Sequence, residues 1–546
     1  MDGRVSESKE SIVSTDPDTS QTGLSRRTII GAAAWSAPVI ALSVATPAVA
    51  ASGSMVVFTT PGPVSTAPGA LLPAIAGQVT GASGPTTVTV TLPTGWTFAA
   101  GKSGTVTTDG SGAFVIPAGT IVASTSVTPA SGALIANAPS ATPGSLALAT
   151  VVSAVPVATS GIVWGENADN TLFVDSSQYS SNLGYAVVPT FIGAGNTFAA
   201  ASIIKMAGAY RSYSSFLIRD DNTLWSHGDG NAGTASGTTG TKAGQFPLPL
   251  ANGERLIDIA GFTGGGFALT NFGSVFAWGY NTGVGTLGNG TTGDTWIPVR
   301  VTFPAGVFIT SISASYTGGI ALDQLGQVWT WGINDGGDLG TGNTASTCSL
   351  PARVVDKAGT PISGITQVAG AFKHSLALKG DQVYSWGYGP GGMLGDGTTT
   401  TRRYADWVLS DAGTPLTGVA KIAVAYHEAY HNAVLMQNGD IYSWGFGSYF
   451  VHDPNSQSSW YFPAKSNYDL STIGTITDVS VSYYGIHVLT QDGSVWNWGY
   501  GIYGQGGNNK FPTYITQPVQ AMVDATTPVV AAGLWPSPHG GVVAHL

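Results

Sequence analysis

The stretch "GAFKHSLALKGDQVYSWG", residues 370–387, decides the fold of this chain. A turn of small residues opens it, the apolar run "SLAL" follows, and a polar turn leads into an aromatic-rich run that ends in Trp386-Gly387. A short apolar run between turn residues predicts a strand that is buried on both faces. Nearly the same pattern returns as "GGFALTNFGSVFAWG", "GGIALDQLGQVWTWG", "HNAVLMQNGDIYSWG" and "GIHVLTQDGSVWNWG", so the stretch is one copy of a repeat.

The repeat has a regular period. Seven positions aligned on Trp-Gly lie 51 to 63 residues apart, and a histidine replaces the tryptophan in the second: Trp164, His227, Trp278, Trp331, Trp386, Trp444 and Trp498. Repeats of this length are typical of propellers and solenoids. Each unit also has a strand-like run such as "ITQVAGAF" before the quoted pattern and a Gly- and Pro-bearing segment after it. Four short strands in each unit predict one propeller blade.

The two ends of the repeat region complement each other. The last unit, "VVAAGLWPSPHGGVVAHL", lacks a Trp-Gly strand, and the first unit begins with that missing piece, "GIVWGEN". We expect Val163 and Trp164 to hydrogen-bond into the sheet begun by Val529 and Val530, which would complete a seventh blade and cover two open sheet edges. The sequence therefore predicts an all-β chain in which residues 161–546 form a seven-bladed β-propeller closed by N- and C-terminal strands.

A family resemblance adds to this prediction. The segment "WGINDGGDLG", residues 331–340, its variants "WGYGPGGMLG" and "WGYGIYGQGG", and the segment "GAFKHSLAL" resemble the regulator of chromosome condensation repeat family. The resemblance covers residues 161–546 and implies a seven-bladed propeller. It weakens at "WSHGDGNAG" and "WGFGSYFVHD", where the Gly-Leu-Gly turn is lost.

The first fifty residues look like an export signal. Arg26 and Arg27 precede a weakly hydrophobic run that contains Pro38 and ends in Ala48-Val49-Ala50. This arrangement resembles a twin-arginine signal peptide with a small-residue cleavage site, and its weak hydrophobicity argues against a stable membrane anchor. We expect residues 1–50 to be a signal peptide of an actinobacterial-like bacterial protein. The mature protein would then be secreted or cell-surface, with no stable membrane span.

Residues 53–160 have a different composition. "TTVTVTLPTGWTF" alternates with period two, which predicts a half-buried strand, and "GTVTTDGSGAFVIPAG" suggests a hairpin that turns at residues 109–112. We expect a small β-sandwich, immunoglobulin-like in architecture, that serves as a spacer or adhesion module. A glycosylated stalk is the alternative for so Thr- and Ser-rich a segment.

Composition excludes several functions. A net charge of −10 argues against a nucleic-acid partner, because such proteins carry a basic face. Cys348 is the single cysteine, so it cannot form an intramolecular disulfide, and we interpret it as a loop residue. No nucleophile elbow and no phosphate-binding loop is evident. The sequence therefore predicts no enzyme, no catalytic residue and no cofactor.

The histidines and aspartates suggest structural roles. We expect His374 and His431 to donate to neighbouring backbone carbonyls at blade turns. His427 and His431 lie four residues apart, but a strand-turn-strand would not bring them together on one metal ion. Asp335 and Asp338 in "NDGGD" suggest Ca²⁺, yet a full oxygen-ligand loop is missing, so we interpret them as turn residues and predict no metal site.

One column of aromatic residues suggests a binding face. An aromatic side chain follows the first strand of each unit, close to Lys373, Tyr430 and other polar or aromatic neighbours. Aromatic residues with few charges are typical of interface hot spots. The alternative is that these residues pack between blades. The predicted partner-binding residues are Tyr210, Phe262, Tyr316, Phe372, Tyr426, Tyr483 and Trp535.

The expected function is that of an exported, non-catalytic, monomeric propeller that binds another protein or a cell-surface polymer. It resembles the secreted propeller inhibitors of β-lactamases from the same repeat family. Nucleotide exchange on a small GTPase, the activity of the family's nuclear member, is an alternative that the export signal disfavours. A polysaccharide-active enzyme on a propeller is another. Ultraviolet sensing is set aside because the Gly-Trp-Arg-His-Thr repeat of the family's photoreceptor is absent.

Overall fold

The computed structural model is all-β, as predicted. Among the residues that the structure describes, the only helical element is the short 3-10 turn η3 (Pro390–Gly392). No helix in this part of the chain has the length and hydropathy needed to span a bilayer. The described residues are 54–60, 64–66, 72, 74–82, 84–123, 131–150, 161–166, 185–191, 203–209, 214–228, 240–281, 283–316, 318–424, 430–447, 451–482, 485–501, 506–508, 510, 512–522, 533–535 and 542–545.

The strands before residue 151 form two main sheets around one core. Val88 and Leu134 of the larger sheet share that core with Ile75 and Phe114 of the smaller one. The strands are β1 (Val56–Phe58), β3 (Ile75–Val79) and β7 (Ala113–Ile116) in one sheet; β2 (Val64–Thr66), β10 (Gly144–Thr150), β9 (Ser131–Asn137), β4 (Thr87–Thr91) and β6 (Thr105–Thr107) in the other; and the pair β5 (Thr97–Phe98) and β8 (Ile121–Val122).

Two predictions for this region have different outcomes. Strand β4 alternates between exposed threonines and buried valines, as the period-two pattern predicts. The turn at residues 109–112 is present, because Gly112 N–H donates to the Asp109 carbonyl at 3.0 Å. The predicted hairpin is wrong, however, because β6 and β7 belong to different sheets. A local turn signal does not determine which sheet each flanking strand joins.

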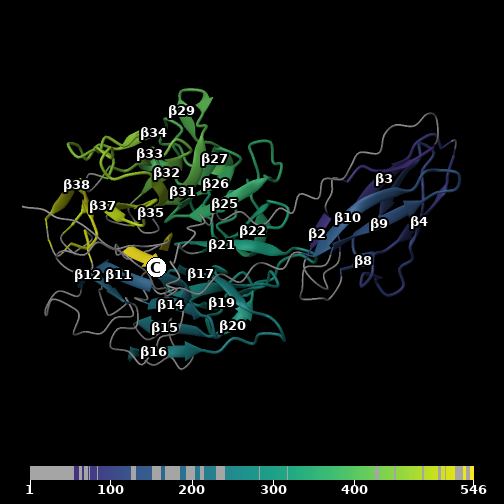
Figure 1. The fold of residues 1–546 in the computed structure, drawn as a ribbon, viewed down its shortest axis with the longest axis horizontal. Helices are drawn as coiled ribbons and strands as arrows, with labels where there is room; N and C mark the ends of the chain where they lie inside the picture. Colours follow the sequence, from purple (N-terminus) through teal and green to yellow (C-terminus); the bar gives the residue numbers. More distant parts are fainter. Residues whose placement is uncertain are drawn as a thin grey trace, which may run out of the picture. The chain divides into compact units, whose positions relative to one another are not determined.

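The repeat region contains seven four-stranded antiparallel sheets among its described residues. Six of them each consist of four strands in sequence order. They are β13 (Ile203–Ala209) to β14 (Ser214–Arg219), β15 (Leu224–Gly228) and β16 (Gly240–Phe246); β17 (Leu256–Phe262), β18 (Gly265–Thr270), β19 (Val275–Gly279) and β20 (Thr295–Arg300); β21 (Ile309–Ser315), β22 (Gly318–Asp323), β23 (Val328–Ile333) and β24 (Thr347–Arg353); β25 (Ile365–Gly370), β26 (His374–Lys379), β27 (Gln382–Gly387) and β28 (Arg402–Trp407); β31 (Val419–Val424), β32 (His431–Met436), β33 (Ile441–Gly445) and β34 (Trp460–Lys465); and β35 (Ile476–Val481), β36 (Gly485–Thr490), β37 (Val495–Tyr500) and β38 (Tyr514–Gln520). Figure 1 shows β14, β15 and β16 of one such sheet side by side. A small pair, β29 (Leu409–Asp411) and β30 (Thr414–Pro415), lies between two of them in sequence.

The remaining four-stranded sheet joins strands from both ends of the repeat region. Its order is β12 (Tyr185–Phe191), β11 (Gly161–Glu166), β40 (Val542–His545) and β39 (Gly533–Trp535). The first strands of successive sheets contact one another, and β39 contacts both β35 and β13. Strands from distant parts of the sequence therefore complete one sheet, as the complementary ends predicted.

Strand β11 joins this sheet by pairing with β40. Val163 and Trp164 pair with Val543 and Val542, and residues 529 and 530, where this sheet was expected to begin, lie outside the described residues. In the other six sheets the Trp-Gly position lies in the third strand, which pairs with the second. The segment "GGVVAHL" therefore corresponds to that second strand.

Four of the Trp-Gly tryptophans link their sheet to the preceding one. Each of these indoles is fully buried, and its Nε1–H donates to a backbone carbonyl in the loop after the third strand of the preceding sheet. The pairs are Trp331 with Thr286 at 2.9 Å, Trp386 with Asp338 at 3.0 Å, Trp444 with Met393 at 2.9 Å and Trp498 with Val451 at 3.2 Å. The Gly-x-Leu-Gly loop thus caps the next sheet, which explains why the motif repeats with the tryptophan.

A buried asparagine holds two of these loops in shape. Asn334 accepts from Leu339 N–H at 3.2 Å and donates to the Ala345 carbonyl at 2.8 Å. Asn281 accepts from Leu287 N–H at 3.0 Å in the same way. Because these side chains replace missing backbone partners, the loop keeps one conformation without regular secondary structure.

Candidate binding surface

The structure describes the side chains of three of the seven predicted partner-binding residues. Tyr210, Tyr426 and Tyr483 lie outside the described residues, and only the backbone of Trp535, in β39, is described. Phe262 ends β17 with no exposed surface, and its ring lies 4.8 Å from that of Phe267. Phe262 fills the core between two sheets, as the packing alternative proposed. Its prediction as a partner-contact residue is therefore wrong.

Tyr316 and Phe372 instead meet at the surface. Their ring centroids lie 4.3 Å apart, and Phe372 lies 5.4 Å from Tyr430. Tyr388 is 6.5 Å from Tyr430. Tyr316, Tyr388 and Tyr430 are partly exposed, and Phe372 is 8% exposed beneath them. We call Tyr316, Phe372, Tyr388 and Tyr430 the aromatic cluster.

Backbone hydrogen bonds position the aromatic cluster. Tyr316 N–H donates to the Ala371 carbonyl at 3.3 Å, and Tyr388 N–H donates to the Lys373 carbonyl at 2.8 Å. Tyr430 has a φ of 51° immediately before β32, a conformation that few non-glycine residues adopt. The four rings come from the ends of strands in three successive sheets, so sheet packing brings them together.

Lys373 is the cation of the aromatic cluster. Its Nζ lies 5.6 Å from the centroid of the Phe372 ring and 5.9 Å from that of Tyr388. An ammonium at this distance from aromatic faces is attracted by their quadrupoles. The rings therefore hold Lys373 in place at the surface.

Asp338 borders the aromatic cluster from the loop after β23. Its Oδ2 accepts from Gly336 N–H at 3.4 Å, and its buried Oδ1 has no partner in the described structure. Burial raises the pKa of Asp338 to about 7, and the negative charge of Asp335 adds to the rise. The positive charges of Lys373 and Arg403 oppose it. Among the described residues no group of three or more potential ligands could hold a metal ion.

Sequence reasoning missed Tyr388 and the setting of Asp338. A signal for Tyr388 was present, because the residue after Trp-Gly is aromatic in most units, as in "WGY" and "WGF". No pattern indicated that the side chain of Asp338 is buried, since its segment has the composition of an exposed turn.

The buried histidines form hydrogen bonds with side chains. His374 Nε2 lies 2.7 Å from Asn432 Oδ1, so the expected backbone acceptor is wrong for His374. His487 contacts Asn497 and Ser482, and His452 Nδ1 lies 2.9 Å from Ser443 Oγ. Burial lowers the pKa of His374 and of His487 to about 4, and that of His452 to about 3. These imidazoles are neutral near neutral pH and belong to the core.

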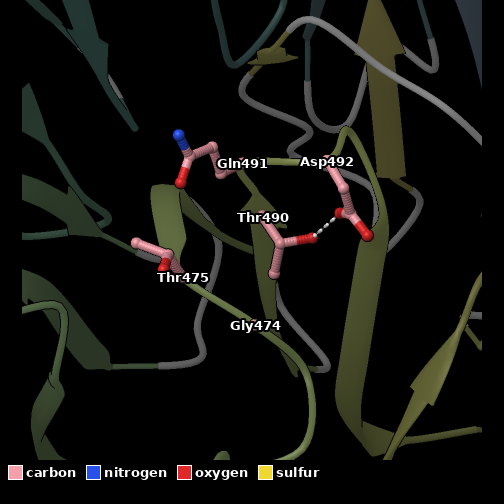
Figure 2. A pocket seen from close by; sticks show the side chains of 5 residues that line it. All are labelled: Gly474, Thr475, Thr490, Gln491 and Asp492. Atoms are coloured by element: carbon pink, nitrogen blue, oxygen red, sulfur yellow. Dashed lines mark hydrogen bonds between the residues drawn. The ribbon is translucent and has the colours of Figure 1, made fainter.

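A shallow hollow of about 320 Å³ lies elsewhere, at the turn between β36 and β37. It is lined by Gly474, Thr475, Thr490, Gln491 and Asp492. Figure 2 shows Thr490 and Asp492 pointing toward each other, and the Thr490 hydroxyl donates to Asp492 Oδ1 at 2.6 Å. This bond, with help from Ser494 N–H, lowers the pKa of Asp492. The carboxylate therefore stabilises the turn.

Comparisons with known proteins identify the repeat. The profile of the regulator of chromosome condensation (RCC1) repeat matches residues 273–322 and 326–378. The chain is 26% identical over 308 residues to the Ultraviolet-B receptor UVR8 of Arabidopsis thaliana, over 56% of this chain and 66% of the receptor. It is 27% identical over 293 residues to the E3 ubiquitin-protein ligase HERC2 of Homo sapiens, over 52% of this chain and 6% of the ligase. The match thus spans less than two thirds of either relative.

Solved structures support the fold. Human WBSCR16 aligns with a TM-score of 0.57 at 20% identity, over 71% of this chain and 99% of that protein. Yeast RCC1 (Prp20), in a structure with Kap60 bound, aligns with a TM-score of 0.59 at 20% identity, over 72% of this chain and 90% of that chain. Residues 273–322 and 326–378 therefore match two regulator of chromosome condensation repeats, and the chain shares the propeller fold of these solved proteins.

Proposed function

We propose that this chain is an exported, non-catalytic, monomeric binding protein that captures another protein or a surface polymer through its aromatic cluster. The observation that carries the proposal is the meeting of Tyr316, Tyr388 and Tyr430, all partly exposed, over Phe372 and beside Lys373. Large aromatic side chains near the centre of an interface each contribute about 2 kcal/mol or more when a partner covers them.

The surroundings of the cluster favour binding over catalysis. Backbone hydrogen bonds hold the residues of the cluster, and their rings pack on one another, so little conformational entropy is lost when a partner binds. The buried histidines are neutral and bonded to core side chains, and Asp492 stabilises a turn. These groups therefore have structural roles already.

Relatives with this fold support a binding role. One similar structure is that of Prp20p from Saccharomyces cerevisiae, described with its binding properties to Gsp1p and histones; its TM-score is 0.56 at 19% identity. Those partners belong to that protein. The proposal that this chain acts outside the cell rests on the twin arginines and cleavage signal of residues 1–50, which lie outside the described residues.

The test is partner capture with matched variants. The first variant combines Tyr316→Ser, Tyr388→Ser and Tyr430→Asn, because asparagine tolerates the positive φ at residue 430. The control combines Ile297→Ser, Leu350→Ser and Tyr461→Ser, which remove exposed apolar side chains from β20, β24 and β34.

Purified chains would be incubated with spent culture medium and with cell-wall extract, and the captured material compared by mass spectrometry. We expect the wild type and the control to retain the same partner and the cluster variant to lose it, with all three melting at similar temperatures. Capture of the same material by the cluster variant would contradict the proposal.

A further inference from the structure

Aromatic rings rather than an ion pair hold Lys373. The protein has 20 Lys and Arg residues against 30 Asp and Glu residues. Six ion pairs are present among the described residues, and Lys373 is in none of them. Its ammonium is instead held over the Phe372 and Tyr388 rings. The charge is thus oriented at the surface without being neutralised.

Arg403 adds a second cation at the same border. It lies in β28, where its Nη1 donates to the Asn334 carbonyl at 3.4 Å, and it too is in none of these ion pairs. A neutral carbonyl does not neutralise the guanidinium charge. Lys373 and Arg403 are therefore two partly exposed cations next to partly exposed aromatic rings.

The nearby carboxylates only partly offset these cations. Asp335 is exposed, so solvent screens its charge. Asp338 is largely buried with an unpartnered Oδ1, a setting that disfavours its charged form. Its pKa of about 7 leaves it protonated about half the time at neutral pH. The border of the aromatic cluster therefore has excess positive charge in a protein whose net charge is −10.

We propose that the aromatic cluster takes an acidic peptide segment of its partner. An Asp or Glu of that segment would pair with Lys373, and an adjacent apolar or aromatic side chain would pack on Tyr316, Tyr388 and Tyr430. This inference rests on the proposed function and specifies the partner's chemistry. A lysine that rings hold in place and no ion pair engages favours a carboxylate, because an anion forms a charge-assisted hydrogen bond with the ammonium.

The experiment uses selected peptides as probes. A displayed library of random dodecapeptides is panned on the full chain, with the Tyr316→Ser, Tyr388→Ser, Tyr430→Asn variant as the counter-selection. Enriched peptides are then synthesised with each Asp or Glu changed to Asn or Gln, and their affinities are measured for the wild type and for Lys373→Gln.

We expect enriched peptides to carry an acidic residue beside an aromatic one. The amide replacement should weaken binding to the wild type about tenfold or more, and binding to Lys373→Gln less than about twofold, as expected for loss of one charge-assisted pair. Peptides that depend on the cluster but lack a required carboxylate would overturn this inference while leaving the proposed function intact. If no peptide is enriched over the counter-selection, this inference fails, whereas the proposed function is decided separately by the capture experiment.

A pH series gives an independent readout. Asp338 faces Lys373, Arg403 and Asp335, and His374 beside Lys373 is buried and neutral. Affinity of the wild type for an acidic peptide should fall at least about threefold between about pH 6 and about pH 8, as Asp338 gains its charge near the bound carboxylate. Asp338→Asn should remove this dependence. A slope that persists in Asp338→Asn, or its absence in the wild type, would refute the role given to Asp338.

Discussion

Gly340→Ala tests the link between successive sheets directly. Gly340 ends the Gly-x-Leu-Gly loop with a φ of 64° and lies against the indole of the next sheet. A Cβ at this position would lie 2.6 Å from Trp386 Cδ1 and 2.9 Å from Trp386 Nε1. The indole cannot move away freely, because it is fully buried and donates to the Asp338 carbonyl.

The expected cost has two parts. A non-glycine residue at this φ costs about 1 kcal/mol of folding free energy. Forcing a methyl group into a packed core costs a further 1–3 kcal/mol, roughly, because neighbouring side chains leave their preferred rotamers. Together they predict that Gly340→Ala lowers the free energy of unfolding by about 2–4 kcal/mol.

Gly359→Ala is the matched control. Gly359 has a φ of 81°, yet a Cβ there would meet nothing within 4 Å, so only the backbone cost of about 1 kcal/mol should appear. Urea unfolding followed by tryptophan fluorescence measures both variants. Equal losses for Gly340→Ala and Gly359→Ala would refute the idea that this loop packs tightly on Trp386.

Three further predictions concern stability. The free energy of unfolding should be unaffected by three buried histidines above about pH 6.5 and should fall as the pH drops toward about 4, because these histidines bind protons only in the unfolded chain. Each histidine should lower the free energy of unfolding by about 2 kcal/mol at about pH 5. These residues are His374, His452 and His487, and urea unfolding at stepped pH would show a flat profile if they were accessible. Arg300→Ala should lower the free energy of unfolding by about 3 kcal/mol at neutral pH, measured by urea unfolding, because the single variant leaves the buried Glu254 carboxylate without its 2.8 Å ion pair. The double variant Arg300→Ala, Glu254→Gln should lose less, because it buries no unpaired charge. Asn334→Ala should lower the free energy of unfolding by about 1–3 kcal/mol in the same assay, because Leu339 N–H loses its acceptor. An unchanged urea midpoint would contradict the role of Asn334 in holding the loop.

The repeat made the fold predictable from the sequence. The apolar run in β26 is buried on both faces, and the Trp-Gly column occupies equivalent third strands, because a pattern that recurs at fixed spacing averages out local ambiguity. The pairing of Val163 was harder to predict. The sequence indicated the sheet that Val163 joins, but not that its partner is Val543 of β40, because no motif marks the register of that strand.

The site was less predictable because burial depends on neighbours in other sheets. Phe262 and Phe372 occupy the same column, yet Phe262 has no exposed surface, while Phe372 lies beneath partly exposed tyrosines. The Asp338 carboxyl is buried because the loop that carries it packs on β28, as shown by Gly337 against Arg403. The spacing of residues within one repeat unit does not predict such contacts between units.

The sheet that joins β11 to β40 has a mechanical consequence. Gly161 and His545 are register partners in an antiparallel pair, so the chain enters β11 and leaves β40 at the same end of their ladder. Tension applied across these two residues would load the hydrogen bonds one after another, as in opening a zipper, rather than all at once in shear. The junction should therefore yield at low force, and the other six sheets would feel that force only after it has opened.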